Sequence, residues 1–254
     1  MCILHYYLCR RLKGGGMEIN MQKLTDALTS LNIRWDDSMA EKLVGYMDGV
    51  LLWNEKINLT AIKDRDDFVE KHLIDSILCC GFEEYINAES VIDVGTGAGF
   101  PGVPLAVISP DKEFVLADSL NKRLKVISNL TEELDIGNVE TVHGRAEELA
   151  RNKKYRETFD VCVSRAVANM AVLAEYCLPF IKKGGYLLAY KGPDAEKEMV
   201  EAEKAVKILG GKLRRIQSAD LEGYEHNIVV IEKIKETPAK YPRKAGTPVK
   251  EPIL

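Results

Sequence analysis

Apolar residues recur with helical spacing through the first third of the chain. Leu24, Leu28 and Leu31 follow an i, i+4, i+7 pattern, and residues 43–50 repeat it. A third stripe of this kind runs from residue 68 to residue 80. Such spacing puts apolar side chains on one helix face, so three helices are predicted. The acidic pairs at 36–37 and 66–67 are expected to cap the second and third helices.

After residue 90 the pattern changes to short apolar strands separated by helical stretches. Helices are predicted at 121–134, 168–180 and 194–209, and strands at 91–95, 113–118, 138–143, 159–164, 185–190, 212–216 and 226–232. Strand–helix alternation with short loops is typical of a Rossmann-like, doubly wound α/β fold. Two successive strands at the end predict a terminal antiparallel strand, so we expect a seven-stranded, mostly parallel sheet.

These patterns divide the chain into a helical N-terminal region (17–89), a Rossmann-like domain (90–232) and a tail (233–254). Residues 241–252 of the tail hold prolines at 242, 248 and 252, and we expect this part to be extended rather than helical. Residues 1–16 do not read as a signal peptide, because their basic residues follow the apolar run. Residues 14–16 are glycines that run directly into Met17, and residues 13–15 fit a ribosome-binding site translated by mistake, so we expect residues 1–16 to be a mis-started extension. Met17 is then the expected start.

Composition narrows the class of protein. The chain has 254 residues, 46% of them hydrophobic and 29% charged, as in ordinary soluble domains. No apolar run approaches the roughly eighteen residues that span a bilayer, so a membrane protein is excluded. The six cysteines form no C-x-x-C pair, so no metal site is predicted, and reduced cysteines fit a cytoplasmic protein.

Charge is distributed unevenly along the chain. The formal net charge is −4, yet residues 233–254 contain six basic and two acidic side chains. A basic tail on an acidic body indicates a polyanionic partner, although a solvated tail has the same composition.

The clearest chemical motif is DVGTGAGFPG, from Asp93 to Gly102, which follows a buried strand. Alternating glycines such as Gly95 allow a tight turn and a close approach of the backbone to a ligand. Amides at the start of the following helix would face that ligand. A purely structural turn would not need three alternating glycines.

Two ligands compete for this loop. Residues 97–102 match the G-x-G-x-x-G dinucleotide pattern, and Asp118 stands where a ribose-binding acid is expected. Asp93 favours S-adenosylmethionine instead, because an acid there can receive an ammonium group, directly or through water, but would repel a pyrophosphate. Asp118 suits either ligand, since both present a vicinal diol. The pattern therefore favours a methyltransferase over a dehydrogenase.

Two further loops follow the third and fourth strands. The loop from His143 to Glu147 would pass an adenine, although a helix cap fits these residues equally well. Arg165 follows the fourth strand, at the edge of the sheet where reacting centres lie in such folds, although a plain salt-bridge partner fits it too. His72 and Asp75, one helical turn apart, are expected to make a capping or interhelix contact.

Taken together, these motifs resemble the RsmG family, also called glucose-inhibited division protein B. The resemblance runs from about residue 20 to the C-terminus. It rests on DVGTGAGFPG, LADSLNKR (116–123), GRAEE (144–148), SRAVA (164–168), YKG (190–192) and YPRKAGTP (241–248), with NLT (58–60) and HLIDS (72–76) upstream.

The resemblance implies a class I methyltransferase that uses S-adenosyl-L-methionine to methylate N7 of a guanine, position 527, in 16S ribosomal RNA. The cofactor positions it implies are Gly95, Phe100, Ala146, Glu147 and Arg165. Asp118 joins them on the general argument for a ribose-binding acid. The expected partner is 16S ribosomal RNA or the small ribosomal subunit, and the expected oligomeric state is a monomer.

The residues agree with N7 chemistry. The chain has no D/N-P-P-Y motif for an exocyclic amine. Guanine N7 has a lone pair and no proton, so positioning can supply most of the catalysis. No catalytic residue is assigned; Arg165 stays protonated, which favours binding or base positioning over proton transfer.

A body with a pI of about 5.7 would bind naked RNA weakly, which favours a partly assembled subunit as the substrate. Basic candidates for RNA contact are Lys122, Arg123, Lys125, Lys240, Arg243, Lys244 and Lys250. The solvated start of a helix explains residues 122–125 equally well. Two other functions remain open: an NAD-dependent oxidoreductase, and a non-catalytic RNA-binding assembly factor.

Overall fold

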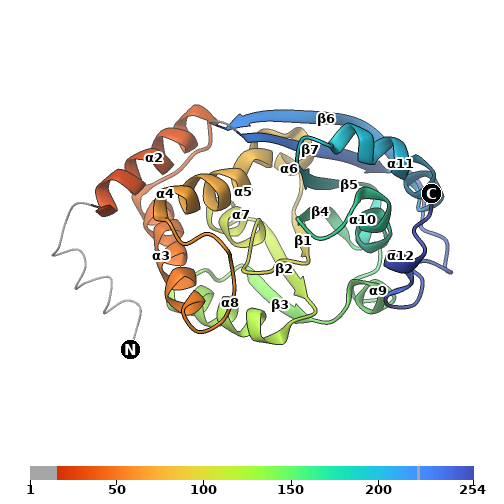
Figure 1. Ribbon diagram of the computed structural model, residues 1–254, viewed down its shortest axis with the longest axis horizontal. Coiled ribbons are helices and arrows are strands. Elements are labelled where there is room, and N and C mark those ends of the chain that lie inside the picture. Colours follow the sequence, from red (N-terminus) through yellow and green to blue (C-terminus); the bar gives the residue numbers. More distant parts are fainter. Residues whose placement is uncertain (1–15, 222–223) are drawn as a thin grey trace.

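The computed structural model describes residues 16–221 and 224–254, and a seven-stranded sheet lies at its centre (Figure 1). The strand order is β3-β2-β1-β4-β5-β7-β6, and β7 runs antiparallel to both of its neighbours. The strands are β1 (Ser90–Val94), β2 (Glu113–Asp118), β3 (Val139–His143), β4 (Phe159–Arg165), β5 (Ile181–Lys191), β6 (Gly211–Leu221) and β7 (Tyr224–Lys233). The predicted sheet is confirmed, although β6 and β7 are longer than expected.

Helices cover both faces of this sheet. One face carries α7 (Gly102–Ile108) and α8 (Asn121–Glu133). The other carries α9 (Ala146–Leu149), α10 (Met170–Cys177) and α11 (Ala195–Ile208). Successive strand residues point to opposite faces, so Val91 joins the first apolar core and Ile92 the second. Burial on both faces explains why the strands read as continuous apolar runs.

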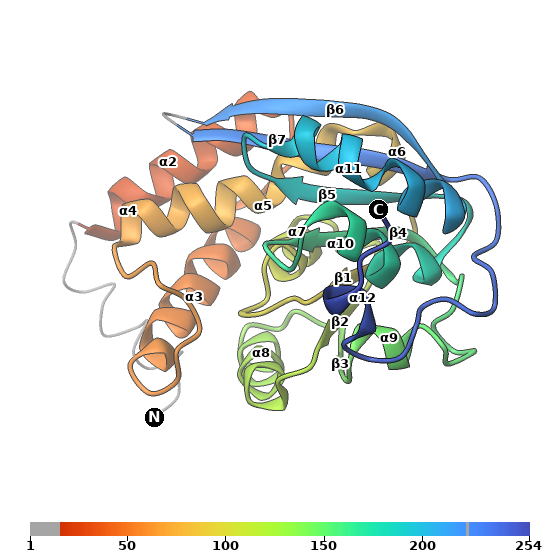
Figure 2. The ribbon, with the colours of Figure 1, turned by 45° about the vertical axis from the view of Figure 1, so that its right-hand side comes forward.

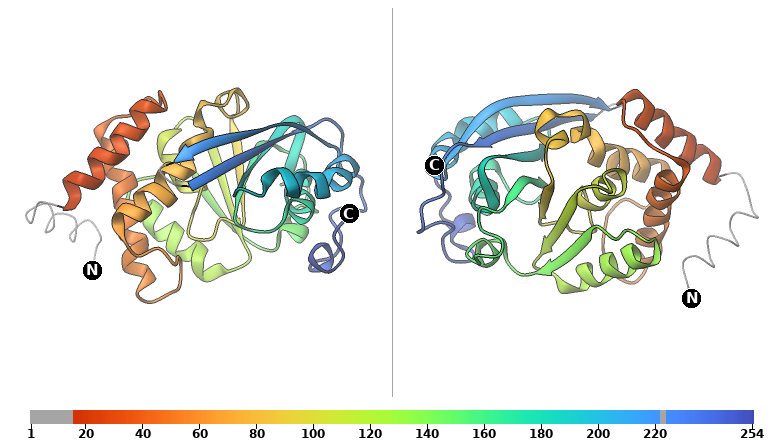
Figure 3. Two further views of the ribbon diagram at one scale, coloured as in Figure 1. Left: turned by 45° about the horizontal axis from the view of Figure 1, so that its top comes forward. Right: turned by 180° about the vertical axis from the view of Figure 1, so that it is seen from behind.

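The N-terminal region packs on the first face of the sheet (Figures 1 and 3). Leu28 and Leu43 share one core with Val91 of β1. The helices are α2 (Gly16–Ser30), α3 (Asp37–Asn54), α4 (Arg65–Phe68), α5 (Asp75–Ile77) and α6 (Glu83–Ile86). The boundary between the helical region and the Rossmann-like domain stays a prediction, and residues 1–15 of the suggested extension lie outside the described residues.

One predicted cap is confirmed and one is wrong. Asp36 caps α3, where its carboxylate accepts a 2.8 Å hydrogen bond from the amide of Met39. The next helix is capped by Asp64, because Asp66 and Asp67 already lie inside its first turn and donate their amides to the Asp64 carboxylate.

The third helical segment is also less regular than predicted. A π-helical turn, Val69–Ile74, separates α4 from α5, and a 3₁₀ turn, Leu78–Gly81, follows α5. The second face shows a similar difference: α10 begins at Met170, capped by Asn169, and its last predicted turn is a 3₁₀ helix.

The C-terminal tail crosses the sheet's second face beside α9 and α10 (Figure 2). The expectation that it contains no helix is wrong for one turn, α12 (Thr247–Lys250). Pro248 sits near the start of that turn, where its missing amide costs no intrahelical hydrogen bond. Within the described part of the chain, we find no helix long and apolar enough to cross a membrane.

Candidate functional site

The glycine loop between β1 and α7 is held from below by Asp93. One carboxylate oxygen, Oδ2, accepts hydrogen bonds from the Thr96 hydroxyl at 2.7 Å and the Gly102 amide at 2.9 Å. The side chain is 0% exposed, and Oδ1 has no hydrogen-bond partner among the described residues. Direct contact with a ligand's ammonium, which the sequence suggested, is therefore not available to this buried carboxylate; its observed role is to shape the loop.

The loop is pressed against the N-terminal region at Gly99. Its φ is +90°, a conformation that favours glycine, and an added Cβ would lie 2.2 Å from the Tyr46 hydroxyl oxygen. That hydroxyl donates a 2.9 Å hydrogen bond to the carbonyl of Ala98. Helix α3 thus fixes the far side of the loop, which explains why this position requires glycine.

A cleft opens where β1, β2 and β3 end, and we call it the β1–β3 cleft. Four of the six predicted cofactor residues line it: Gly95, Asp118, Ala146 and Glu147. The rest of its lining is Val94, Ala117, Ser119, Gly144, Arg145, Val167 and Tyr176. The carboxyl ends of parallel strands meet at one edge of the sheet, so residues far apart in the sequence converge there.

Two carboxylates, from Asp118 and Glu147, belong to the lining of the β1–β3 cleft. Asp118, at the end of β2, accepts the amide of Gly97 at 2.9 Å and the amide of Leu120 at 2.7 Å. Glu147, in α9, accepts the amide of Gly246 at 2.8 Å. Backbone amides therefore orient both carboxylates, and apolar side chains form part of the same lining.

Phe100 and Arg165, the other two predicted cofactor residues, do not line the β1–β3 cleft; they meet beside it. The Phe100 ring is largely buried and stacks on the His72 imidazole, with 4.6 Å between centroids. The Arg165 guanidinium carbon lies 5.5 Å from the centroid of the same phenyl ring. The structure thus gathers the six predicted residues into two adjoining groups.

Arg165 is tied to the N-terminal region by its guanidinium. Nη1 donates to the carboxylate of Asp75 and, at 3.1 Å, to the carbonyl of Lys71, while Nη2 lies 2.9 Å from Nδ1 of His72. His226 of β7 approaches Asp75 from the other side, with its Nδ1 2.8 Å from Oδ1. The interhelix contact expected for His72 and Asp75 is thus a contact with strands β4 and β7.

The electrostatics of this group are unusual. Burial, reinforced by the charge of Arg165, lowers the pKa of His72 from 6.5 to about 3. An arginine can only donate, so Nδ1 of His72 is the acceptor and Nε2–H donates to the Thr60 hydroxyl at 2.7 Å. Burial alone would raise the pKa of Asp75, but the hydrogen bond from His226 and the charge of Arg165 lower it overall.

Burial raises the pKa of Asp93 from 3.8 to about 7, against the opposing hydrogen bonds from Thr96 and Gly102. The hydrogen bond to Asp75 raises the pKa of His226. Burial acts on both carboxylates in the same direction, but the net pKa shifts are opposite, because Asp75 has direct contacts with Arg165 and His226 whereas Asp93 does not.

Sequence reasoning missed several residues of both groups. Val167 and Ser119 belong to the motifs at 164–168 and 116–123, so the sequence could have indicated them as cleft residues. Tyr176 and His226 carry no local signal, because each reads as an ordinary member of a helix or strand. The reverse also occurs: Arg243, a candidate for RNA contact, forms an ion pair with the buried Glu175.

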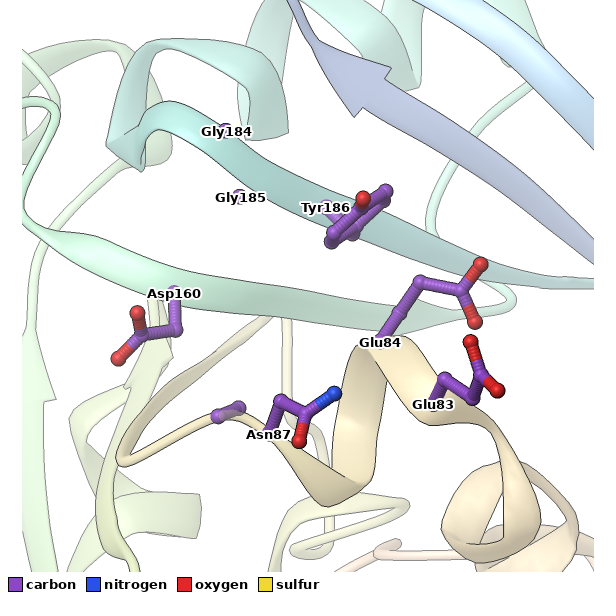
Figure 4. A pocket seen from close by; sticks show the side chains of 8 residues that line it. Glu83, Glu84, Asn87, Asp160, Gly184, Gly185 and Tyr186 are labelled. Carbon is purple, nitrogen blue, oxygen red and sulfur yellow. The ribbon is translucent and has the colours of Figure 1, made fainter.

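A second hollow lies at the opposite end of the sheet (Figure 4). Glu83 and Glu84 of α6, with Asn87 just after that helix, face the start of β4 and the Gly184–Tyr186 part of β5 across it. Two of its three acids already have partners: Glu84 pairs with Arg215, and Asp160 accepts a hydrogen bond from Ser90. Among the described residues no group of His, Cys, Asp and Glu could hold a metal ion.

Comparison of the sequence with known proteins identifies the family that it matches. The family model described as "rRNA small subunit methyltransferase G" matches residues 39–229. "Ribosomal RNA small subunit methyltransferase G" from Clostridium novyi is 47% identical, over 91% of this chain and 96% of its own length. The protein of the same name from Alkaliphilus oremlandii is 49% identical, over 91% of this chain and 97% of its own.

Solved structures show the same fold at much lower identity. An O-methyltransferase from Bacillus cereus matches with a TM-score of 0.53 and 15% identity, over 81% of this chain and 95% of its own. The O-methyltransferase TomG from Streptomyces achromogenes gives 0.53 and 14%, over 82% and 94%. Both likenesses concern the fold alone.

Proposed function

The chain belongs to the family of rRNA small subunit methyltransferase G, and we propose that it transfers a methyl group from S-adenosylmethionine to N7 of the guanine at position 527 of 16S ribosomal RNA. Membership makes the chain a methyltransferase that acts on ribosomal RNA, so an NAD-dependent oxidoreductase and a non-catalytic assembly factor are not favoured. The methylated atom, N7, and the nucleotide, guanine 527, are what we propose beyond family membership.

The observation that carries the proposal is the convergence of Gly95, Asp118, Ala146 and Glu147 on one cleft. This set fits S-adenosylmethionine. The Asp118 carboxylate suits a ribose diol, and Gly95 lets the backbone approach the methionine part closely. Glu147 and the neighbouring backbone suit the polar edge of an adenine. When bound, the cofactor supplies an electrophilic methyl group on a sulfonium.

The Arg165 group beside the β1–β3 cleft fits the chemistry at N7. The new N7–methyl bond forms as the sulfur–methyl bond breaks, and no proton leaves the guanine. His72 is a weak base because its pKa is lowered to about 3, and Arg165 stays protonated, so neither readily accepts a proton, and the reaction at N7 requires no base. Asp75 offsets the charge of Arg165, which lessens repulsion of the cationic product. These residues position the reactants rather than move protons.

We further propose that the enzyme acts as a monomer, in the cytoplasm, on a partly assembled small subunit. The exposed tail residues Lys240, Lys244 and Lys250 remain candidates for phosphate contact. Arg243 is better explained by its ion pair with Glu175.

The test is methyl transfer from labelled S-adenosylmethionine to small-subunit particles that lack the modification, with the labelled base mapped. Label at N7 of guanine 527 is expected, and naked 16S RNA is expected to be the poorer substrate. Label at another base would overturn the nucleotide assignment. Equal transfer to naked RNA would overturn the preference for the subunit.

A further inference from the structure

The C-terminal tail is bound closely to the wall of the β1–β3 cleft. We call residues 237–250 the strap. It leaves the sheet after β7 and passes α10 and α9, the two helices that contribute Tyr176, Ala146 and Glu147 to the β1–β3 cleft (Figure 2).

Two arginines after α9 hold the first part of the strap by its backbone carbonyls. Arg156 donates to the carbonyl of Thr237 at 2.7 Å and to that of Tyr241 at 2.9 Å. Arg151 donates to the carbonyl of Pro242 at 2.6 Å. Charged donors make strong hydrogen bonds, so the path of the strap is set before it reaches the β1–β3 cleft.

The middle of the strap is fixed by a buried ion pair. Glu175 of α10 is fully buried, and its two oxygens accept Nε and Nη2 of Arg243 at 3.0 and 2.7 Å. The Arg243 backbone amide donates to the same carboxylate at 2.7 Å. A buried carboxylate needs such partners, so the strap is built into the fold and does not hang in solvent.

The last part of the strap contacts a residue that lines the β1–β3 cleft. The amide of Gly246 donates to Oε1 of Glu147 at 2.8 Å, and no described residue donates to Oε2. Gly246 has a φ of +82°, and nothing lies within 4 Å of an added Cβ. One oxygen of Glu147 is thus occupied by the strap, and the other remains available to a ligand.

We propose that the strap positions Glu147 for the adenine end of the cofactor, with the Gly246 amide as the group that orients the carboxylate. The inference rests on the proposed function, because it takes the ligand of the β1–β3 cleft to be S-adenosylmethionine. Gly246 and Arg243 act through Glu147 and are positioning residues. The strap therefore contributes to cofactor affinity although it does not line the β1–β3 cleft.

The experiment measures binding of S-adenosylhomocysteine and of 5′-methylthioadenosine by calorimetry to the full chain and three variants. Gly246→Pro lacks the amide and cannot adopt a positive φ, whereas Gly246→Asn keeps the amide and tolerates that φ. Arg243→Lys keeps the positive charge beside Glu175 but loses the two-pronged contact. Thermal unfolding of each ligand-free protein is recorded alongside.

Gly246→Pro is expected to bind both ligands about tenfold more weakly, since a hydrogen bond to a charged group is lost. Arg243→Lys should also bind both ligands more weakly than the parent, whereas Gly246→Asn should bind them as tightly as the parent. Because 5′-methylthioadenosine lacks the amino-acid end, an equal loss for both ligands assigns the effect to the adenosine end. The unfolding midpoint of Gly246→Pro should fall by only a few degrees, so that the ligand-free variant stays folded at the temperature of the binding measurement.

Unchanged binding by Gly246→Pro would overturn the inference, as would equally weak binding by Gly246→Asn. A loss confined to S-adenosylhomocysteine would overturn it too, because the strap would then act on the amino-acid end. If the unaltered chain bound neither ligand, the proposed function itself would fail, which keeps the two failures apart.

Discussion

The imidazole of His72 lies flat against the phenyl ring of Phe100, with 4.6 Å between ring centroids and 5° between planes. Arg165 joins the pair, since its Nη2 lies 2.9 Å from Nδ1 of His72. Phe100 belongs to the glycine loop, Arg165 to the end of β4 and His72 to the N-terminal region. A residue of the π-helical turn in that region therefore contacts both Phe100 and Arg165, which are proposed cofactor residues.

Among the charged residues around Arg165, Asp75 is expected to cost the most stability when its charge is removed. Asp75→Asn removes the buried partner of Arg165 and His226, and loss of such a partner costs about 3 kcal/mol of unfolding free energy. Asp67→Asn is the matched control, because Asp67 is 49% exposed and pairs with Lys71 on the helix surface. It should cost less than about 0.5 kcal/mol in the same urea titration. Equal costs would contradict a buried ion pair.

His72 should make stability depend on pH in a defined direction. Its folded pKa of about 3 lies below the ordinary 6.5, so protons bind the unfolded chain more tightly. The contribution is full above pH 6.5 and is lost as the pH falls toward 3. His72→Gln cannot titrate; relative to this variant, the parent should lose about 2 kcal/mol between pH 7.5 and pH 5. Parallel stability curves would show that His72 titrates normally.

The contribution of His226 to stability should depend on pH in the opposite direction to that of His72. Its pKa is raised by Asp75, so its contribution is full below pH 6.5 and is lost as the pH rises through the folded value. Relative to His226→Gln, the parent should become less stable across that range. A proton resonance titration of the two imidazoles separates them directly.

Gly99 should tolerate no side chain. Gly99→Ala places a Cβ 2.2 Å from the hydroxyl oxygen of buried Tyr46, at a φ of +90°. The expected cost is about 2–4 kcal/mol of unfolding free energy, with weaker binding of S-adenosylhomocysteine, because the loop must move. Gly137→Ala is the control: nothing lies within 4 Å of its Cβ, so stability should stay within about 0.5 kcal/mol. A tolerated Gly99→Ala would mean that α3 does not fix the loop.

The sequence predicted the sheet well because strand and helix periodicities are local signals. Gly95, Asp118, Ala146 and Glu147 could be brought together on paper, since each follows a strand and parallel strands end at one edge. The role of Asp93 could not be predicted, because the sequence pattern does not show whether a carboxylate at a strand end points toward the ligand or toward the backbone of the loop. In the structure, the Thr96 hydroxyl and the Gly102 amide donate to the Asp93 carboxylate, so it points toward the loop.

Contacts made by tertiary packing were beyond the sequence. The pairing of Arg243 with Glu175 joins residues far apart in the chain, and nothing near either of them signals the other. The Asp64 cap was missed for a smaller reason: three aspartates lie within four residues, and spacing alone does not say where a helix begins.

Asp93 supplies a last test, because its buried carboxyl has a folded pKa of about 7 against an ordinary 3.8. A raised acid binds its proton more tightly when folded, so its contribution is full below about pH 4 and is lost as the pH rises through 7. Asp93→Asn stays neutral; relative to this variant, the parent should lose on the order of 2 kcal/mol between pH 5 and pH 8. Urea titrations of both proteins at the two pH values measure the difference. Parallel behaviour would mean that Asp93 is ionised throughout, and it would reopen an attraction between this carboxylate and the ammonium group of the cofactor.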